Sequence, residues 1–340
     1  MTKILVTGGA GFIGAHLTEK LINLKHKVMV VDSLKTIGGI PYVNPKSIFV
    51  RGDIRSNKII KKIEKWKPEI IFHLAAQSGG ESAYDNPKYD YLSNGYGTYL
   101  LSVVAKKINV KYFVYTSSVA VYGSNPNSKI TEKSKINPDS IYGVSKYVGE
   151  MFIKQTLYST KSRTRIFRVF NTFGPGENLN FLKKGLVSIY SSYVWRNKPI
   201  VVKGSLYRFR NLNYIDDCVN ILVKSVSNKT LKKNEIFNLS SGRVTTIKQL
   251  INEILKVNNK KKYKIQIKKG TPGDSFGYHA SNKYLRKKFA NYRFIKLQKG
   301  LKKYFQWIDK LPKNKKLYNY HPLKLAQKQG LKIRRRELSV

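Results

Sequence analysis

The stretch TGGAGFIG, residues 7–14, decides the fold of this chain. It follows a run with the apolar character of a strand and opens a segment with the apolar spacing of a helix. Its glycines recur as G-x-G-x-x-G, at Gly9, Gly11 and Gly14, with Gly8 just before them. Such glycines permit a tight turn, admit a pyrophosphate close to the backbone, and let helix and strand pack closely. The stretch predicts a dinucleotide site at a helix N-terminus, formed by Gly8, Gly11, Phe12, Ile13 and Gly14.

The next two strand-like runs each end on an acidic residue. KVMVVD, residues 27–32, places Asp32 where a carboxylate accepts hydrogen bonds from the adenosine ribose. Its negative charge repels a 2′-phosphate, so the predicted cofactor is NAD rather than NADP. Asp53 ends the run SIFVRGD and is either a neighbour of the adenine, together with Ile54, or the cap of a turn.

Strands and helices alternate through the first half of the chain. We expect strands over residues 3–9, 27–32, 47–53, 69–76, 111–118 and 164–171, and helices over 14–26, 98–109 and 139–157. This alternation is typical of a parallel sheet covered by helices on both faces. The predicted class is α/β, a doubly wound parallel Rossmann sheet with a smaller, interleaved C-terminal α/β domain that binds substrate.

The alternation becomes less regular after residue 172. We expect helices over 184–197 and 213–228, a strand over 199–204, and a late strand over 235–242 that rejoins the main sheet. The predicted NAD-binding domain covers residues 1–172, with segments near 212–242 returning to it. Residues 173–320 form mainly the substrate-binding domain, and residues 321–340 form a basic tail.

Composition narrows the class of protein. The 340 residues are 41% hydrophobic, which excludes a disordered chain and allows a large core. No run approaches the about 18–20 apolar residues of a membrane span, and the N-terminus lacks a signal-peptide pattern. The single cysteine, Cys218, excludes an internal disulfide framework and indicates a cytoplasmic protein. The net charge of +46 is spread over the whole chain, so we expect solvated faces rather than a specific nucleic-acid partner.

A phenol and an ammonium recur on one helical face in YGVSK, residues 142–146. The Lys146 ammonium is expected to stabilise a phenolate and to lower the pKa of Tyr142, which would make Tyr142 a general base. This spacing often arises by chance, so its context matters. The strand before it ends on two hydroxyls, Ser117 and Ser118.

Seven motifs in order resemble the extended short-chain dehydrogenase/reductase family, which includes nucleotide-sugar epimerases and dehydratases. They are TGGAGFIG (7–14), HLAAQ (73–77), TSSVAVYG (116–123), YGVSK (142–146), RVFNTFGPG (168–176), RNLNYIDD (210–217) and NLSSG (238–242). The likeness covers roughly residues 2–310. The resemblance implies that Ser118, Tyr142 and Lys146 form the catalytic triad, with a nucleotide-diphosphate sugar as substrate.

The resemblance also implies binding residues. Contacts to NAD would come from Leu74, Ala75, Ala76, Gln77, Asn94, Ser117, Tyr142, Lys146 and Phe170. Contacts to the substrate would come from Ser118, Asn171 and Arg210, with Arg210 on the diphosphate. Many relatives carry a phosphate-binding arginine where this chain has Gly277, and Arg208 is a candidate substitute. Relatives often form homodimers through a four-helix interface that includes the Tyr-Lys helix.

The residues after Ser118 bear on the reaction. Dehydratases of the family carry Asp-Glu there, whereas this chain has Val119 and Ala120, neither of which transfers a proton. We therefore expect epimerisation, at carbon 4 as in the UDP-glucose/UDP-galactose type, through a transient keto-sugar and return of hydride to the opposite face. Departures from the family pattern at Glu81, Gly277 and Asn211 suggest a less common sugar, and we expect it to serve a surface polysaccharide.

Two alternatives remain open. Within the family, the chain could be a nucleotide-sugar 4,6-dehydratase or a keto-sugar reductase. From another class, it could be a non-catalytic NAD-binding or RNA-binding protein that keeps the fold. No cluster has metal-ligand spacing, so no metal is expected, and His16 and His73 are interpreted as structural residues.

Overall fold

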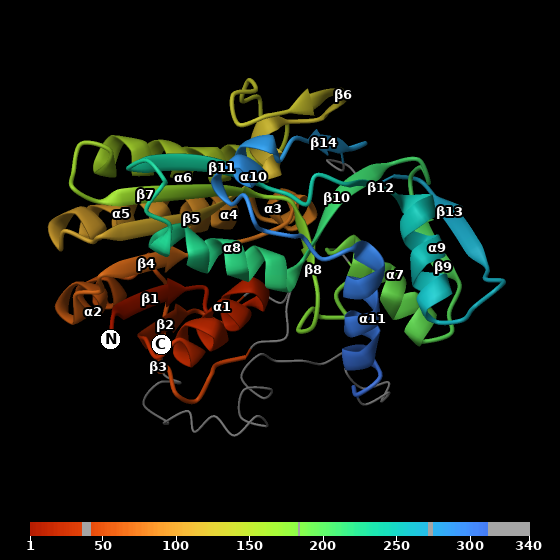
Figure 1. Cartoon of the computed structure of the whole chain (residues 1–340), viewed down its shortest axis with the longest axis horizontal. Helices are drawn as coiled ribbons and strands as arrows, with labels where there is room; N and C mark the ends of the chain where they lie inside the picture. The colour runs from red at the N-terminus through yellow and green to blue at the C-terminus, as the bar shows by residue number, and fades with distance from the viewer. Residues whose placement is uncertain (36–41, 183, 271–274, 312–340) are drawn as a thin grey trace.

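The computed structural model describes residues 1–35, 42–182, 184–270 and 275–311, without the side chains of residues 125–128. The predicted basic tail over residues 321–340 lies outside this part of the chain. A large lobe contains a broad twisted sheet between helices, and a smaller lobe extends from one end of it (Figure 1).

The main sheet has seven strands, and all of them are parallel. In spatial order they are β11 (Asn234–Leu239), β7 (Arg163–Val169), β5 (Tyr112–Ser118), β4 (Ile70–His73), β1 (Lys3–Thr7), β2 (Lys27–Asp32) and β3 (Ile48–Arg51). The order changes direction between β1 and β4. The carboxyl ends of β1 and β4 meet there, with Thr7 in register with His73. A doubly wound sheet binds its ligand at such a reversal.

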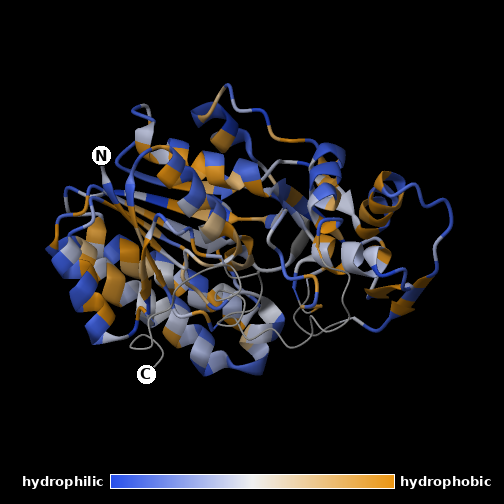
Figure 2. Cartoon of the chain, turned by 90° about the horizontal axis from the view of Figure 1, so that it is seen from below, coloured by the Kyte–Doolittle hydropathy of each residue, from blue (hydrophilic) through white to orange (hydrophobic). Residues whose placement is uncertain are grey.

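Alternate residues of each strand face opposite layers of helices. Ile4 and Val6 of β1 pack toward one layer, whereas Leu5 packs toward the other. The first layer consists of α1 (Phe12–Asn23) and α8 (Ile215–Ser227), and the second of α2 (Asn57–Trp66), α5 (Gly97–Lys107) and α6 (Ile141–Leu157). Figure 2 shows apolar colouring along the strands between these layers. Strands buried on both faces read as continuous apolar runs, as the sequence indicates.

The smaller lobe is built from the second half of the chain. Its helices are α7 (Leu186–Trp195), α9 (Ile247–Val257) and α11 (Leu297–Ile308), packed beside the parallel pair β9 (Ile200–Lys203) and β13 (Ile265–Lys268). A three-stranded sheet joins the lobes through β8 (Asn171–Phe173), β10 (Phe209–Tyr214) and β12 (Val244–Thr246). A second parallel pair is β6 (Asn125–Ile130) with β14 (Tyr278–Ala280), and α10 (Lys283–Lys288) lies near β11.

The predicted α/β class is confirmed, and most differences concern boundaries. The late strand is present as β11, which lies beside β7 at the edge of the main sheet. The strand expected over 69–76 ends at His73, because the residues that follow leave the sheet as a loop along the pocket. The helix expected over 213–228 starts only at Ile215, since β10 extends to Tyr214.

No helix in the described ranges combines the length and the apolar character that crossing a bilayer requires.

Candidate active site

The glycine loop between β1 and α1 forms one end of a pocket. Gly8 has a φ of +70°, and a Cβ on it would lie 2.6 Å from the backbone nitrogen of Ala75. A Cβ on Gly14 would lie 2.0 Å from the carbonyl oxygen of Gly8. Neither position accepts a side chain. Gly11, the N-cap of α1, provides no side-chain cap, so amides of the first turn are open to an anion such as the NAD pyrophosphate.

Asp32 connects the end of β2 to this loop. Its Oδ2 accepts a hydrogen bond from the backbone nitrogen of Ala10 at 3.0 Å, and its Oδ1 accepts one from Leu34 at 2.8 Å. Burial raises the pKa of Asp32, and these backbone hydrogen bonds oppose that rise. Each carboxylate oxygen has a second lone pair. Asp32 therefore has the capacity to orient the loop and to accept ribose hydroxyls as well.

Asp53 lies at the end of the pocket near β3 and also caps a turn. It lines the pocket, and its Oδ1 also accepts a hydrogen bond from the backbone nitrogen of Arg55 at 3.0 Å, as a turn cap does. The Arg55 guanidinium donates hydrogen bonds to both carboxylate oxygens, at 2.8 Å to Oδ1 and at 2.6 Å to Oδ2. Lys35 lies 3.7 Å from the same carboxylate, so these two cations are directed to Asp53.

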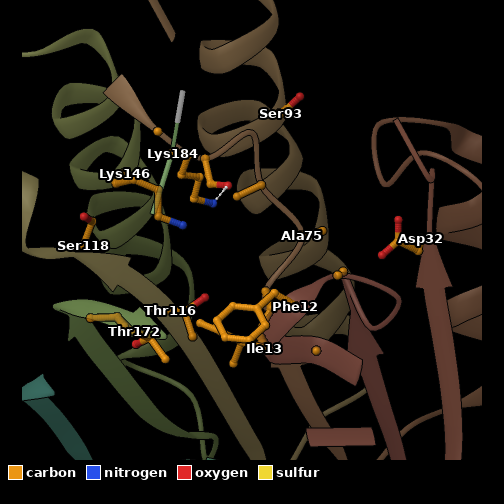
Figure 3. A pocket seen from close by; sticks show the side chains of 18 of the residues that line it. Phe12, Ile13, Asp32, Ala75, Ser93, Thr116, Ser118, Lys146, Thr172 and Lys184 are labelled. Carbon is orange, nitrogen blue, oxygen red and sulfur yellow. Dashed lines mark hydrogen bonds between the residues drawn. The ribbon is translucent and has the colours of Figure 1, made fainter. Parts of the chain in front are cut away.

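The pocket runs from the glycine loop to the carboxyl ends of β5 and β7 (Figure 3). It brings together most of the residues predicted from the sequence: Gly8, Gly11, Phe12, Ile13, Gly14, Asp32, Asp53, Ile54, Leu74, Ala75, Ala76, Ser117, Ser118, Tyr142, Lys146, Phe170 and Asn171. Four predicted residues lie elsewhere: Gln77, Asn94, Arg208 and Arg210.

Asn94 and Gln77 lie behind the pocket wall. The Asn94 side-chain nitrogen donates to the carbonyl oxygen of Gln77 at 3.0 Å, to Asp90 Oδ2 at 3.1 Å and to Ser145 Oγ at 3.0 Å. Asn94 belongs to a π-helical turn, η1 (Leu92–Tyr96), and is fully buried. The amide thus joins three segments behind the wall, and the structure does not bring these two side chains to the pocket.

The two predicted substrate arginines point into the smaller lobe instead. The Arg210 guanidinium donates to the carbonyl oxygens of Phe209, Phe276 and Ser275 at 2.8, 3.1 and 2.9 Å. Arg208 donates to the carbonyl oxygens of Lys203 and Ser205. Backbone carbonyls of neighbouring segments accept hydrogen bonds from both guanidinium groups, and neither arginine is among the residues that line the pocket.

Gly277 has a packing reason to lack a side chain. A Cβ at this position would lie 2.7 Å from the ring of Phe209. The backbones of the two residues form an isolated parallel β-bridge. The arginine expected here from the family resemblance would displace that ring. Glu81 lies in the short helix α3 (Gly80–Asp85) and is not among the residues that line the pocket. Asn211 bonds within the protein, donating to the carbonyl oxygen of Arg243 at 2.9 Å.

The end of the pocket that holds the predicted catalytic residues is formed by β5 and α6. Ser118, the last residue of β5, accepts a hydrogen bond from the backbone nitrogen of Ala120 at 3.2 Å and so starts the 3-10 turn η2 (Val119–Tyr122). Ser140 caps α6 by accepting from Gly143 at 3.1 Å. These two caps orient the strand end and the helix, and Ser118, Tyr142 and Lys146 face the same pocket.

The charge state of the Tyr-Lys pair differs from the expectation. Burial raises the pKa of Tyr142 to about 12, a hydrogen bond with Ser118 opposes this, and Asp90 raises it further. Burial lowers the pKa of Lys146 to about 7 against the pull of Asp90 and Glu150. The predicted lowering of the Tyr142 pKa is thus not seen, because desolvation by burial is the largest contribution to the pKa of each group.

Asp90, which the sequence reasoning missed, lies under this end of the site. It belongs to α4 (Pro87–Tyr91), is fully buried, and accepts hydrogen bonds from Ser145 Oγ and Asn94. Burial raises the pKa of Asp90 to about 6, with Ser145, Lys146 and Asn94 lowering it. A lone acid in a loop-rich stretch carried no sequence signal that would have distinguished it.

Ser117 is held by a buried ion pair. Its hydroxyl donates to Glu150 Oε1 at 2.6 Å, and Glu150 receives the Arg168 guanidinium through contacts of 3.0 and 2.7 Å. These groups join β5, α6 and β7 beneath the pocket. The hydroxyl of Ser117 therefore supports the strand end, while Ser118 faces the reacting region.

The wall beyond Ser118 is apolar. Val119 lines the pocket and is only 7% exposed. Across from it the pocket includes Lys184 and Glu177, which the sequence reasoning also missed. Burial raises the pKa of Glu177 to about 7, and the hydrogen bond from the backbone nitrogen of Gly174 opposes this.

The two histidines expected to be structural lie away from the pocket. His73 is fully buried between Thr7 Oγ1 at 2.7 Å and Thr98 Oγ1 at 2.9 Å, and burial lowers its pKa to about 3. His16 Nε2 lies 2.8 Å from the carbonyl oxygen of Pro175. Within the described ranges, no three His, Cys, Asp or Glu side chains gather as a metal would require.

A sequence profile of the NAD dependent epimerase/dehydratase family matches residues 4–240, from β1 to the end of β11. The chain belongs to this family. As a member of the NAD dependent epimerase/dehydratase family it is an enzyme, and its cofactor is NAD. The glycine cradle and Asp32 fit the adenosine and pyrophosphate of NAD.

Individual members of the family are similar to most of this chain. It is 35% identical over 254 residues to a putative UDP-glucose 4-epimerase of Methanocaldococcus jannaschii, covering 74% of this chain and 81% of the relative. It is 30% identical to a UDP-glucose 4-epimerase of Pasteurella multocida, covering 91% and 98%. The crystal structure of UDP-glucose 4-epimerase from Thermotoga maritima with UDP-glucose matches with a TM-score of 0.84 and 28% identity, over 91% of this chain and 99% of that one.

Proposed function

We propose that this enzyme epimerises the sugar of a nucleotide-diphosphate sugar at carbon 4. The observation that carries the proposal is the arrangement of Ser118, Tyr142 and Lys146 on one pocket with the glycine loop, followed by the apolar Val119. Relatives named UDP-glucose 4-epimerase support the same reaction class.

The chemistry divides between the cofactor and these side chains. NAD, when bound, supplies a reversible hydride acceptor. Tyr142 Oη takes the proton of the sugar hydroxyl, and Ser118 Oγ donates a hydrogen bond to the same oxygen. The resulting keto-sugar rotates within the pocket, so that hydride returns to the opposite face of its carbonyl group. Tyr142 then returns the proton to the carbonyl oxygen. Sugar and cofactor thus end the cycle without net oxidation.

Lys146 makes this proton transfer possible near neutral pH. A phenol with a pKa of about 12 is almost fully protonated near neutral pH. It acts as a base only if a nearby group accepts its proton. Burial lowers the pKa of Lys146 to about 7, so near neutral pH part of the Lys146 population is a neutral amine, which accepts the proton of Tyr142. We assign Lys146 as the group that shares the proton of Tyr142.

A dehydratase would require an additional acid at the sugar. Val119 and Ala120 provide none, but Glu177 lines the pocket with a pKa raised by burial to about 7. Glu177 accepts a hydrogen bond from the backbone nitrogen of Gly174 at 3.1 Å and is restrained by it. The product of the reaction therefore has to be identified directly.

The test uses the NAD-loaded protein with UDP-, dTDP-, GDP- and CDP-sugars in D₂O, followed by NMR. Epimerisation predicts an inverted carbon 4 with no solvent deuterium on that carbon, since the same hydride returns. A 4-keto-6-deoxy product that carries solvent deuterium would establish the dehydratase. Stoichiometric consumption of NADH with a keto-sugar would establish the reductase. Salt-sensitive RNA binding without turnover of any sugar would favour the non-catalytic alternative.

We further propose a homodimer formed through the α5/α6 face. This face consists of Tyr96, Tyr99, Val103, Val144 and Met151, which are 38–46% exposed. The two helices pack side by side, so two copies would form a four-helix interface. Exposed apolar side chains gathered on neighbouring helices are typical of interaction surfaces.

We also propose that the enzyme acts in the cytoplasm and that its product serves surface polysaccharide synthesis. An activated sugar of this kind is consumed by glycosyl transfer. Cell fractionation would test the location, and sugar analysis of the polysaccharide from a deletion strain would test the pathway.

A further inference from the structure

The pocket contains a second lysine besides the catalytic one. Among the pocket-lining residues that the structure describes, the cationic side chains are Lys146 and Lys184. Lys184 precedes α7 and enters from the smaller lobe, whereas Lys146 comes from α6. Figure 3 shows both ammonium groups directed into the same hollow. The proposed mechanism uses Lys146 and leaves Lys184 without a role.

The position of Lys184 is defined by contacts with the large lobe. Its ammonium donates a hydrogen bond to Ser78 Oγ, in the loop between β4 and α3. Its aliphatic stem lies beside Gly79, where a Cβ would be 3.6 Å from Lys184 Cδ. One hydrogen bond leaves two further protons of the ammonium available. The side chain is therefore held at the junction of the two lobes, and its ammonium has N–H donors available for a ligand.

The charges around Lys184 favour an anion. Burial lowers the pKa of Lys184, and the carboxylate of Glu177 raises it. Lys184 in turn lowers the pKa of Lys146, so the two ammonium groups repel one another across the pocket. An anionic oxygen placed between them would relieve both the repulsion and the desolvation.

The expected arginine anchors do not occupy this place. Arg210 and Arg208 donate to backbone carbonyls in the smaller lobe, and neither lines the pocket as described. A diphosphate needs cationic or amide donors at its oxygens. Among the described residues that line the pocket, Lys184 is the cation that the proposed mechanism does not use.

We propose that Lys184 is the anion anchor of the substrate. The assignment rests on the proposed function, since it takes the substrate to be a nucleotide-diphosphate sugar. Its ligand is an anionic oxygen, which comes either from the diphosphate common to all such substrates or from a carboxylate on the sugar of a hexuronic acid. Ser78 positions the ammonium for that contact.

The experiment measures calorimetric dissociation constants of the NAD-loaded protein for UDP-glucose and UDP-glucuronate. These ligands share the nucleotide and differ in the charge on carbon 6. The variants are Lys184→Met, Lys184→Arg and Ser78→Ala, and the matched control is Lys58→Met, an exposed lysine of α2. Thermal unfolding confirms that each variant is folded.

We expect Lys184→Met to weaken binding at least about tenfold, as the loss of a charge-assisted hydrogen bond implies. Lys184→Arg and Lys58→Met should stay close to wild type, and Ser78→Ala should show a smaller loss. A loss for both ligands assigns the contact to the diphosphate. A loss for UDP-glucuronate alone assigns it to the sugar carboxylate.

Two results would overturn the proposal. One is unchanged binding of both ligands by Lys184→Met, and the other is an equal loss in Lys184→Arg, which would indicate packing rather than charge. Measuring turnover of each variant distinguishes a failure of the Lys184 proposal from a failure of the proposed function. Binding that depends on Lys184 without epimerisation rejects the reaction and keeps the anchor, whereas epimerisation by Lys184→Met at wild-type affinity rejects the anchor alone.

Discussion

The ammonium nitrogen of Lys146 lies 4.4 Å from the ring centroid of Tyr115, in the interior of the large lobe. Lys146 is 2% exposed, and the carboxylates of Asp90 and Glu150 attract its charge. The ring and these carboxylates compensate only part of the cost of burial, so the pKa of Lys146 falls to about 7. The burial of Lys146 is therefore a cost to the stability of the folded state.

This cost predicts how stability depends on pH. Unfolded Lys146 has an ordinary pKa of 10.5, whereas the folded value is about 7, so between these values the unfolded state binds more protons. Stability should therefore rise with pH across this window, and Lys146→Met should flatten the rise. Urea unfolding of wild type and Lys146→Met at pH 8.5 and 9.5 measures the effect, because both values lie more than one unit above the pKa of Glu177. Parallel profiles for wild type and variant would contradict the assigned pKa.

Tyr142→Phe should abolish most turnover while the cofactor stays bound. The substitution removes one oxygen from the pocket, and loss of a general acid–base group typically lowers kcat by about 10²–10⁴-fold. Single-turnover NMR with NAD quantified by mass spectrometry would separate the two effects. Tyr147→Phe, on the same helix, should retain activity. Full activity in Tyr142→Phe would reject the mechanism.

Arg168→Met should strongly destabilise the fold. Arg168 and Glu150 are 3% and 0% exposed and meet at 2.7 Å, so removing one partner leaves a buried charge without compensation. The expected loss is about 3–5 kcal/mol of unfolding free energy. The double variant Arg168→Met with Glu150→Leu should recover part of it. Equal unfolding midpoints for wild type and Arg168→Met would show that the pair is energetically neutral.

Gly14→Ala should prevent NAD binding. A Cβ at Gly14 would overlap the carbonyl oxygen of Gly8, at 2.0 Å, and so would displace the loop that receives the pyrophosphate. Gly270→Ala is the matched control, since its Cβ would have a nearest contact of 3.8 Å. The amount of NAD retained after purification, with a titration of added NAD, measures the change. Wild-type affinity in Gly14→Ala would contradict the role of the cradle.

Val144→Glu should dissociate the proposed dimer. The substitution places a charge on the α5/α6 face, in the first turn of α6, where a second copy would bury it. Sedimentation velocity at several protein concentrations gives the oligomeric state. Val244→Glu is the control, because Val244 is 40% exposed on β12, in a different part of the molecule. A monomeric wild type would reject the interface.

Local patterns in the sequence predicted the elements of the site that depend on chain neighbours. The glycine loop, Asp32 at a strand end, and Tyr142 with Lys146 on a helix each follow from spacing along the chain. The order of the parallel strands then brings their carboxyl ends together, which is why these residues share one pocket. The family resemblance added Asn94 and Arg210, and the structure turns both toward other protein groups.

The sequence by itself determined that a parallel sheet would present a dinucleotide loop and a Ser-Tyr-Lys set, because strand and helix periodicities and turn glycines are local properties. Only the tertiary structure decided the charges in the pocket. Desolvation depends on every segment that packs around a group, so the shifted pKa values of Tyr142 and Lys146 could not be obtained from their spacing. The same holds for TGGAGFIG: its pattern predicts a phosphate site, and its contact with the loop at Ala75 shows why Gly8 must be glycine.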